Sequence, residues 1–336
     1  MKVFKCPCVV GYSKVNYFNF FQSKFSSNLH DFDNITIETL TNHKDIEIIN
    51  DNYFDWISPS KITNSIISIT KQNKLNVSEN LDTLMNFYLN NICKHIVLRF
   101  YGTFTISNIK RSLRDLNKYN IHSVLIVLDF EKSYFTDAFG ELIMNLPFNK
   151  KLIVFNSPFE KNFEDTMYFT KKTKICGYNK SINEFRVNIT LHSESQAHHT
   201  YFNRKLYIGP NGEIKNAPEC EDSFGFIQDL DNPDQLKSII QTPEFQKYWF
   251  VHKEISDVCK DCEFRHMCVD NRLPYQRKEN EWYHKIECNY NPYIAKWEGE
   301  EGYKNLAECG VISNENGFTI DHDKIAEINA KLWPDE

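Results

Sequence analysis

The sequence predicts an α/β protein with a small cysteine-rich lobe towards its C-terminus. Two observations lead to this fold class. Between residues 95 and 159, apolar runs long enough for buried strands begin about 28 residues apart, which is the length of a βαβ unit. After residue 193 the pattern changes to turns and loops, and "CKDCEFRHMC" (259–268) contains three closely spaced cysteines.

The α/β pattern is clearest in the middle of the chain. The segments "HIVLRFYG" (95–102), "SVLIVLDF" (123–130) and "KLIVFNSPF" (151–159) have the composition of buried strands. The segments between them, residues 107–120 and 135–146, have the apolar spacing of amphipathic helices. This alternation predicts a parallel sheet covered by helices, either open or part of a barrel.

Residues 1–90 are predicted to form an N-terminal α+β region of short strands and helices. Within it, "VNYFNFF" and "FSSNLHDF" are expected to pair as a hairpin, and "NLDTLMNFYLNNI" has helical apolar spacing. A leader-binding module in this region is one alternative, for which the pattern gives no specific sign.

The C-terminal part is predicted to begin near residue 193. Residues 204–218 indicate a hairpin that turns at Gly209-Pro210-Asn211-Gly212, and a helical segment follows near 232–250. The expected division is therefore an N-terminal region (1–90), an α/β scaffold (91–192) and a metal-binding domain (193–336).

Composition and charge restrict the class of protein. Of the 336 residues, 41% are hydrophobic and 25% are charged, so the chain can form a sizeable core. A net charge of −6 argues against a general nucleic-acid binder. No run approaches the roughly 18 apolar residues of a membrane span, and the N-terminus lacks the features of a secretory signal. A cytoplasmic location without a membrane partner is expected.

The cysteines indicate a metal site. Ten cysteines are too sparse for a disulfide scaffold, and in a reducing compartment clustered cysteines are typically metal ligands or nucleophiles. Cys259 and Cys262 form a CxxC pair, and Cys268 and Cys288 follow. Four thiolates suit either tetrahedral zinc or a [4Fe–4S] cluster, and the spacing leaves this choice open. The alternative is that they are ordinary buried thiols, or that only the CxxC pair is redox active.

The same segment carries a family resemblance. "CKDCEFRHMC" followed by "CNYNPY" resembles the SPASM domain, the cysteine-rich extension of radical S-adenosylmethionine peptide-modifying enzymes. Together with "HHTYFNRKLYIGPNGEIKNAPE" (198–219) and "AKWEGEEGY" (295–303), it resembles more closely the SPASM-bearing partner of grasp-with-spasm peptide-maturation systems. The resemblance covers roughly residues 190–310. It implies an ATP-grasp ligase and a short precursor peptide as partners, and a partial or degenerate (β/α) barrel upstream.

The sequence also departs from the SPASM pattern. The resemblance places further cysteines of a complete domain at Tyr201, at Ala217 and at Asn271 or Arg272. In the full domain those positions serve the first auxiliary cluster, and the cysteines present here serve the second. The resemblance therefore implies one surviving four-cysteine site, with the ligands Cys259, Cys262, Cys268 and Cys288.

The radical signature is missing as well, because Cys-x3-Cys-x2-Cys occurs nowhere in the sequence. Without it, no S-adenosylmethionine cluster is expected, and radical catalysis of the usual kind is not predicted. With all four sulfurs supplied by the protein, the remaining site is closed, which favours a structural role over a catalytic one.

A second candidate site lies in "LHSESQAHHTYFNRK" (191–205). Its polar residues predict a face that grips a peptide or the ligase. A mononuclear metal site that combines one histidine with Glu194 is an alternative, and packing at the domain boundary is another. The candidate residues are His198, His199, Asn203, Arg204 and Lys205.

These observations predict an accessory protein of ribosomal-peptide maturation, which binds the precursor peptide or its ATP-grasp ligase. The chain has no Walker, Rossmann, GxSxG or HExxH motif, so ATP use is assigned to the ligase. The alternative is an unorthodox metalloenzyme that itself modifies the peptide, with His198 or His199 in its site or with the cluster passing electrons. A stand-alone zinc-stabilised interaction protein is a third hypothesis.

Overall fold

The computed structural model describes residues 62–70, 84–89, 93–172 and 188–333, except positions 103, 117, 120, 135 and 164, together with residues 182 and 185. The hairpin predicted within residues 15–32 lies outside the described residues, and so does most of the region 1–90, for which a leader-binding module is the alternative.

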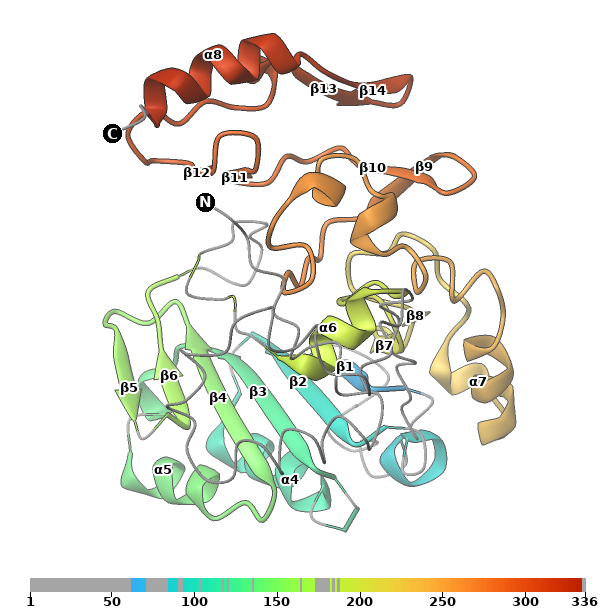
Figure 1. Cartoon of the computed structure of the whole chain (residues 1–336). Coiled ribbons are helices and arrows are strands. Elements are labelled where there is room, and N and C mark those ends of the chain that lie inside the picture. Colours follow the sequence, from blue (N-terminus) through green and yellow to red (C-terminus); the bar gives the residue numbers. More distant parts are fainter. Residues whose placement is uncertain are drawn as a thin grey trace, which may run out of the picture.

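A mixed, mainly parallel sheet forms the centre of the described chain (Figure 1). Its strand order is β5-β6-β4-β3-β2-β1-β7-β8, with antiparallel pairs only at the two ends, β5 with β6 and β7 with β8. The eight strands are β1 (Asn64–Thr70), β2 (His95–Tyr101), β3 (Ser123–Asp129), β4 (Asn149–Phe155), β5 (Lys161–Phe163), β6 (Met167–Phe169), β7 (Lys205–Ile208) and β8 (Ile214–Lys215).

The helices between the strands pack against one face of this sheet. Helix α4 (Ile106–Leu116) follows β2, and α5 (Asp137–Met144) follows β3. Each begins at a threonine whose hydroxyl accepts a backbone N–H of the first helical turn. Thr105 Oγ1 accepts from Asn108 N at 3.2 Å, and Thr136 Oγ1 accepts from Phe139 N at 3.3 Å.

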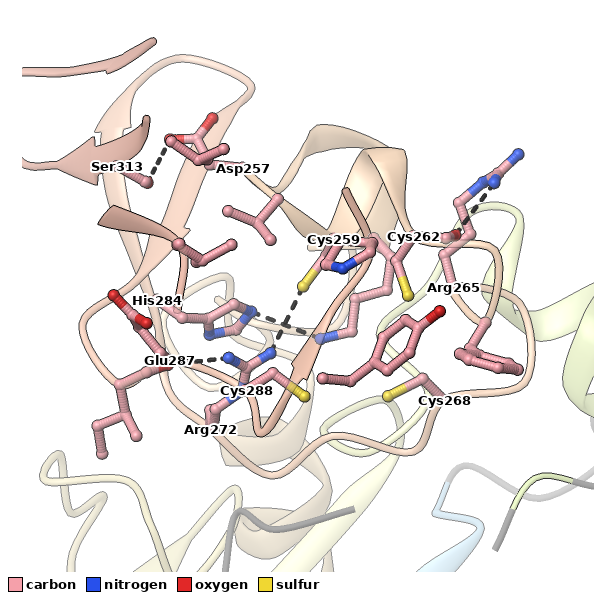
Figure 2. A pocket seen from close by; sticks show the side chains of 18 of the residues that line it. Asp257, Cys259, Cys262, Arg265, Cys268, Arg272, His284, Glu287, Cys288 and Ser313 are labelled. Carbon is pink, nitrogen blue, oxygen red and sulfur yellow. Dashed lines mark hydrogen bonds between the residues drawn. The ribbon is translucent and has the colours of Figure 1, made fainter. Parts of the chain in front are cut away.

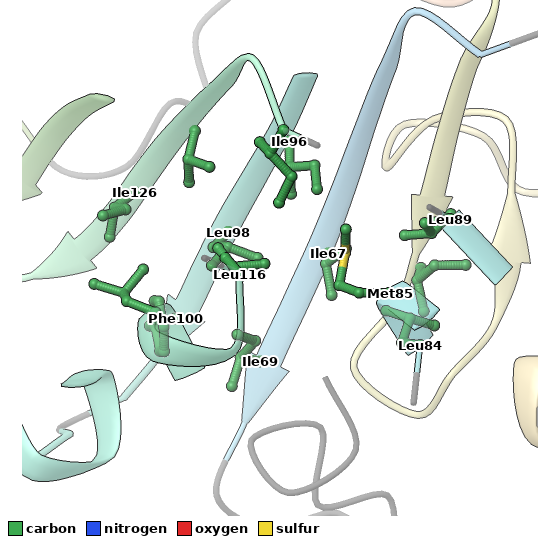
Figure 3. Close-up of a cluster of buried hydrophobic side chains, with 14 of the residues drawn as sticks. Ile67, Ile69, Leu84, Met85, Leu89, Ile96, Leu98, Phe100, Leu116 and Ile126 are labelled. Atoms are coloured by element: carbon green, nitrogen blue, oxygen red, sulfur yellow. The ribbon is translucent and has the colours of Figure 1, made fainter. Parts of the chain in front are cut away.

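The main core lies between these helices and the sheet (Figure 3). Because strand side chains alternate, Ile67 and Ile69 of β1 face the same side as Leu98 of β2. Leu116 of α4 and Met85 of the π-helix Leu84–Leu89 cover them, and all are fully buried. This mixed α/β fold with a mainly parallel sheet confirms the α/β part of the predicted fold class. The partial barrel and the metal-binding character of the cysteine-rich lobe stay predictions.

The opposite face of the sheet carries polar side chains near β7. Ser68 of β1 donates a hydrogen bond to the Tyr207 hydroxyl at 3.0 Å, and Lys205 of β7 is also buried. The hairpin predicted at Gly209–Gly212 is confirmed as the β7–β8 turn. Because β7 pairs with β1, the sheet continues past residue 193.

The rest of the C-terminal part consists of short elements joined by loops, and Figure 1 shows most of it on the far side of the molecule from α4 and α5. Its small sheets are three antiparallel pairs. The elements are α6 (Ile189–Ser195), α7 (Pro233–Ile240), β9 (Pro274–Lys278) with β10 (Glu281–His284), β11 (Tyr290–Asn291) with β12 (Lys296–Trp297), β13 (Val311–Asn314) with β14 (Gly317–Ile320), and α8 (His322–Leu332). None of the helices described has the length and apolar character needed to cross a membrane.

Candidate metal centre

The first cysteine follows an unusual turn. Val258 has φ 65° and ψ −50°, and the N–H of Cys259 donates to the carbonyl of Asp257 at 2.6 Å. This is a γ-turn with positive φ, a strained conformation for a β-branched residue. Asp257 is held by Arg277 Nη2 at 2.5 Å and by the Ser313 hydroxyl at 3.0 Å. The turn redirects the chain so that Cys259 starts a short 3₁₀ helix, Cys259–Asp261.

All four predicted ligands line one cavity of about 100 Å³. Figure 2 shows the sulfur atoms directed towards a common space, from the 3₁₀ helix on one side and from the loops around residues 268 and 288 on the other. Each of the four cysteines is half-buried and none forms a disulfide. The structure therefore brings together the four residues that the sequence predicts as ligands: Cys259, Cys262, Cys268 and Cys288.

The spacing of potential ligand atoms distinguishes two parts of this region. Among the described residues, the one group of three ligand atoms that all lie within 4.8 Å of one another is Cys259, Asp270 and His284. No three of the four cysteine sulfurs come this close together. The Nζ of Lys253 already lies 2.5 Å from Asp270 Oδ2 and 3.5 Å from His284 Nε2. An ammonium group therefore occupies the cation position of that triad.

A buried charge network forms one wall of the cavity. The side chains of Lys253, Asp270 and Arg272 are all at most 7% exposed. Burial alone would raise the pKa of Asp270, but the two cations outweigh it and hold that pKa well below its usual range. Burial keeps the pKa of His284 well below its ordinary value, so its ring is neutral. Two cations and one anion leave this wall with one net positive charge.

Aromatic rings form another wall. Phe264 stacks on Phe185 with ring centroids 4.7 Å apart, and Tyr290 packs on Trp297 at 4.6 Å. All four line the cavity that the cysteines share, and the Tyr290 hydroxyl donates to Glu263. This wall excludes water from one side of the cysteines, as expected around a metal site.

The positions where the resemblance expects further cysteines meet at a different place. The Tyr201 hydroxyl donates to Glu219 Oε2 at 2.9 Å, and Asn271 Nδ2 donates to Glu219 Oε1 at 3.2 Å. Ala217 is fully buried in the same cluster as Tyr201. Arg272, the other candidate position, points instead towards Cys259. Hydrogen-bonded and apolar side chains thus fill the location where these residues converge.

The polar segment after α6 is largely inside the protein. His199 is 2% exposed, and its Nδ1 accepts the backbone N–H groups of Tyr201 and Phe202 at 3.1 and 3.3 Å. Lys205 lies over the Tyr201 ring at 2.9 Å, and burial lowers the pKa of Lys205 to about 7. Asn203 Nδ2 donates to Glu194 at 2.8 Å.

His198 and Arg204 are the half-buried members of that predicted face, and His198 packs on Phe250 with ring centroids 5.3 Å apart. The five candidates therefore share a segment without forming one exposed surface. Partner binding through His198 and Arg204 stays a prediction.

Sequence reasoning missed the charge network. Lys253 begins a short 3₁₀ helix (Lys253–Ile255), Asp270 lies in a loop and His284 ends β10, so the three share no periodic pattern and no motif. For Arg272, the sequence indicates only that it stands at or next to an expected cysteine position. The one available signal was the placement of Asp270 and Arg272 directly after the third cysteine of the cluster.

Glu194 gives a test of pH dependence near this segment. Burial raises its pKa to about 7, whereas the ordinary value is 4.5. The folded protein therefore holds a proton that the unfolded chain releases, and stability falls as the pH rises from about 4.5 to about 7. Glu194→Gln is expected to remove this fall and to raise the free energy of unfolding at pH 8 by about 2 kcal/mol. Denaturant unfolding at pH 5 and pH 8 measures it.

The matched control is Glu221→Gln, which changes an exposed carboxylate and is expected to leave the pH dependence as in the wild type. Equal pH profiles for the wild type and Glu194→Gln would show that Glu194 is not responsible.

Comparison with protein-family models, with curated proteins and with solved structures found no match to this chain. The class defined by its fold and site is thus a mixed α/β protein with a cavity lined by four cysteines.

Proposed function

We propose that this chain is a cytoplasmic accessory protein of ribosomal-peptide maturation with a single metal centre and no radical chemistry of its own. One observation carries the proposal. The four cysteines of the SPASM-like motif share one cavity, whereas none of the positions expected to hold a second ligand set carries a cysteine. Tyr201 and Asn271 both donate to Glu219, and Ala217 packs in the cluster of Tyr201, where Cys220 is a free thiol. That division supports the resemblance to grasp-with-spasm proteins.

The cavity suits a metal group held entirely by protein thiolates. In a tetrahedral zinc site with Zn–S bonds of about 2.3 Å, the sulfurs lie about 3.8 Å apart. Four thiolates also suit a [4Fe–4S] cluster, in which each thiolate binds a different iron. Either group would tie the loops around residues 259–268 and 288 into one folded unit.

The α/β part serves as a scaffold in this proposal. Neighbouring strands β6, β4, β3, β2, β1 and β7 run parallel, with helices between several of them. This arrangement supports a degenerate (β/α) barrel related to that of the radical enzymes. Its role is to carry the C-terminal domain and to bind the precursor peptide or present it to the ATP-grasp ligase.

The metalloenzyme alternative has less support in the described residues. His199 uses Nδ1 to accept two backbone N–H groups and is buried, so it does not face a substrate. A centre with four protein thiolates offers no open ligand position.

The test combines the full chain with the ATP-grasp ligase and the short peptide encoded next to it. We expect the purified chain to bind the peptide or the ligase, to increase the yield of the ligase product, and to leave the peptide mass unchanged when the ligase is omitted. Cys288→Ser serves as a variant that lacks the centre. A change in peptide mass produced by this chain alone would establish the enzyme instead. The absence of a neighbouring ligase and peptide gene would favour the stand-alone interaction protein.

A further inference from the structure

Buried charged side chains are costly, and the wall beside the cysteines contains three of them. Lys253, Asp270 and Arg272 are 4%, 1% and 7% exposed. The attraction within a buried ion pair offsets the desolvation penalty only if every charge has a partner. Asp270 neutralises one of the two cations, and one positive charge remains without a carboxylate partner within this network.

The remaining charge is directed at the cysteines. Arg272 is fixed by Asp270, which accepts from Nε at 3.0 Å and from Nη2 at 2.7 Å, and by the carbonyl of Ile286, which accepts from Nη1 at 2.8 Å. In this orientation Nη2 also donates to Cys259 Sγ at 3.5 Å. Figure 2 shows the guanidinium beneath Cys259 and next to Cys288. The guanidinium group of Arg272 therefore connects the charge network to the predicted ligands.

We propose that Arg272 and Lys253 are positioning residues of the metal centre, which hold buried positive charge against the four thiolates and thereby strengthen metal binding. This inference rests on the proposed function, because it requires a metal on the four cysteines. Four thiolates outweigh the charge of a divalent ion, so the loaded centre is an anion inside the protein. Nearby cations and N–H donors to the sulfurs stabilise such a centre, and loss of outer partners typically lowers metal affinity 10-fold to 100-fold.

The same cavity supplies a matched control. Arg265 also lines it, but its Nη1 donates to the Cys262 carbonyl at 3.2 Å and its Nε lies 3.9 Å from Glu254. Its side chain is 30% exposed, and Figure 2 shows it pointing away from the sulfur atoms. Arg265 therefore has the same charge and no sulfur contact.

The experiment measures the Zn²⁺ affinity of the full chain, reduced and freed of metal, in competition with a chromogenic chelator. Arg272→Gln is expected to weaken Zn²⁺ binding about tenfold or more. Arg272→Lys keeps the positive charge but loses the several N–H donors of the guanidinium group. It is expected to retain most of the wild-type Zn²⁺ affinity. Arg265→Gln is expected to stay within about twofold of the wild type, since exposed charges contribute little.

Wild-type affinity in Arg272→Gln would overturn the inference, and so would an Arg272→Lys variant as weak as Arg272→Gln. If Arg272→Gln does not fold, Lys253→Met is the second test. Its Zn²⁺ affinity is expected to be lower than that of the wild type, and an unchanged Zn²⁺ affinity would contradict the inference. Failure of the proposed function gives a different result. In that case the wild type purified without oxygen would contain neither zinc nor iron, or Cys288→Ser would bind Zn²⁺ as tightly as the wild type.

Discussion

Replacing Cys288 by serine is expected to remove the metal from the purified protein and to loosen the fold around the cavity. Cys288 lies about twenty residues beyond the other three ligands, so it closes the longest loop of the centre. A neutral hydroxyl is a much poorer metal ligand than a thiolate, and structural metal binding contributes directly to folding. We expect the metal content to fall at least about tenfold. Elemental analysis and absorption spectra of protein purified without oxygen measure this loss.

Cys220→Ser is the control for this variant. Cys220 is a buried free thiol that packs in the cluster of Phe202 and Ala217, so it lies outside the cysteine-lined cavity. Its replacement is expected to leave the metal in place. Equal metal content in the wild type and Cys288→Ser would rule out the four-cysteine centre. In the wild type, about one zinc per chain would identify a zinc site, and about four irons with matching sulfide would identify a cluster.

Asp270→Ala is expected to lower the free energy of unfolding by about 3–5 kcal/mol. The carboxylate of Asp270 contacts both Lys253 and Arg272, and its removal leaves two cations buried side by side without a counter-charge. The cost is larger than that of a surface ion pair because Lys253 and Arg272 are buried, so water cannot solvate their uncompensated charges. Chemical denaturation of the full chain, followed by the fluorescence of buried tryptophans such as Trp282, measures the change.

The matched control for this prediction is Asp234→Ala. Asp234 pairs with Lys237 at 2.6 Å on the surface, where its side chain is 82% exposed. Loss of this pair is expected to cost less than about 1 kcal/mol. If the two alanine variants were equally stable, the buried network would not contribute to folding as its burial implies.

The central strands and helices were predictable because their signals are local. β3 is a continuous apolar run bounded by Ser123 and Asp129, β2 is apolar except for Arg99 between its ends, and α5 begins directly after a threonine cap. The β7–β8 hairpin was equally clear from its Gly-Pro-Asn-Gly turn. In contrast, the placement of β1 between β2 and β7 was not predicted. Strand order depends on which distant segments cover the same core, and a single sequence does not display that.

The closeness of the four cysteines around one cavity was predictable for a similar reason, and the surroundings of that cavity were not. CxxC spacing restricts the chain enough to show that Cys259 and Cys262 face one space. The contact between Lys253 and Asp270 joins a short 3₁₀ helix to a loop 17 residues later, and both side chains are buried. Burial of a charged residue in an irregular segment leaves no pattern in the sequence. The positively charged wall of Lys253, Asp270 and Arg272 is therefore visible only in the three-dimensional structure.

The γ-turn before Cys259 is held in place by residues near the C-terminus. Arg277 bonds to Asp257 and also to the carbonyls of Asn314 and Gly317, so the β13–β14 hairpin clamps the strained backbone at Val258. A free chain would leave this conformation readily. Because the hairpin fixes the turn, the conformational entropy of this segment is lost during folding, and Cys259 is ordered by residues more than fifty positions later in the chain. In the proposed metal centre, the first ligand would therefore be preorganised before the metal binds.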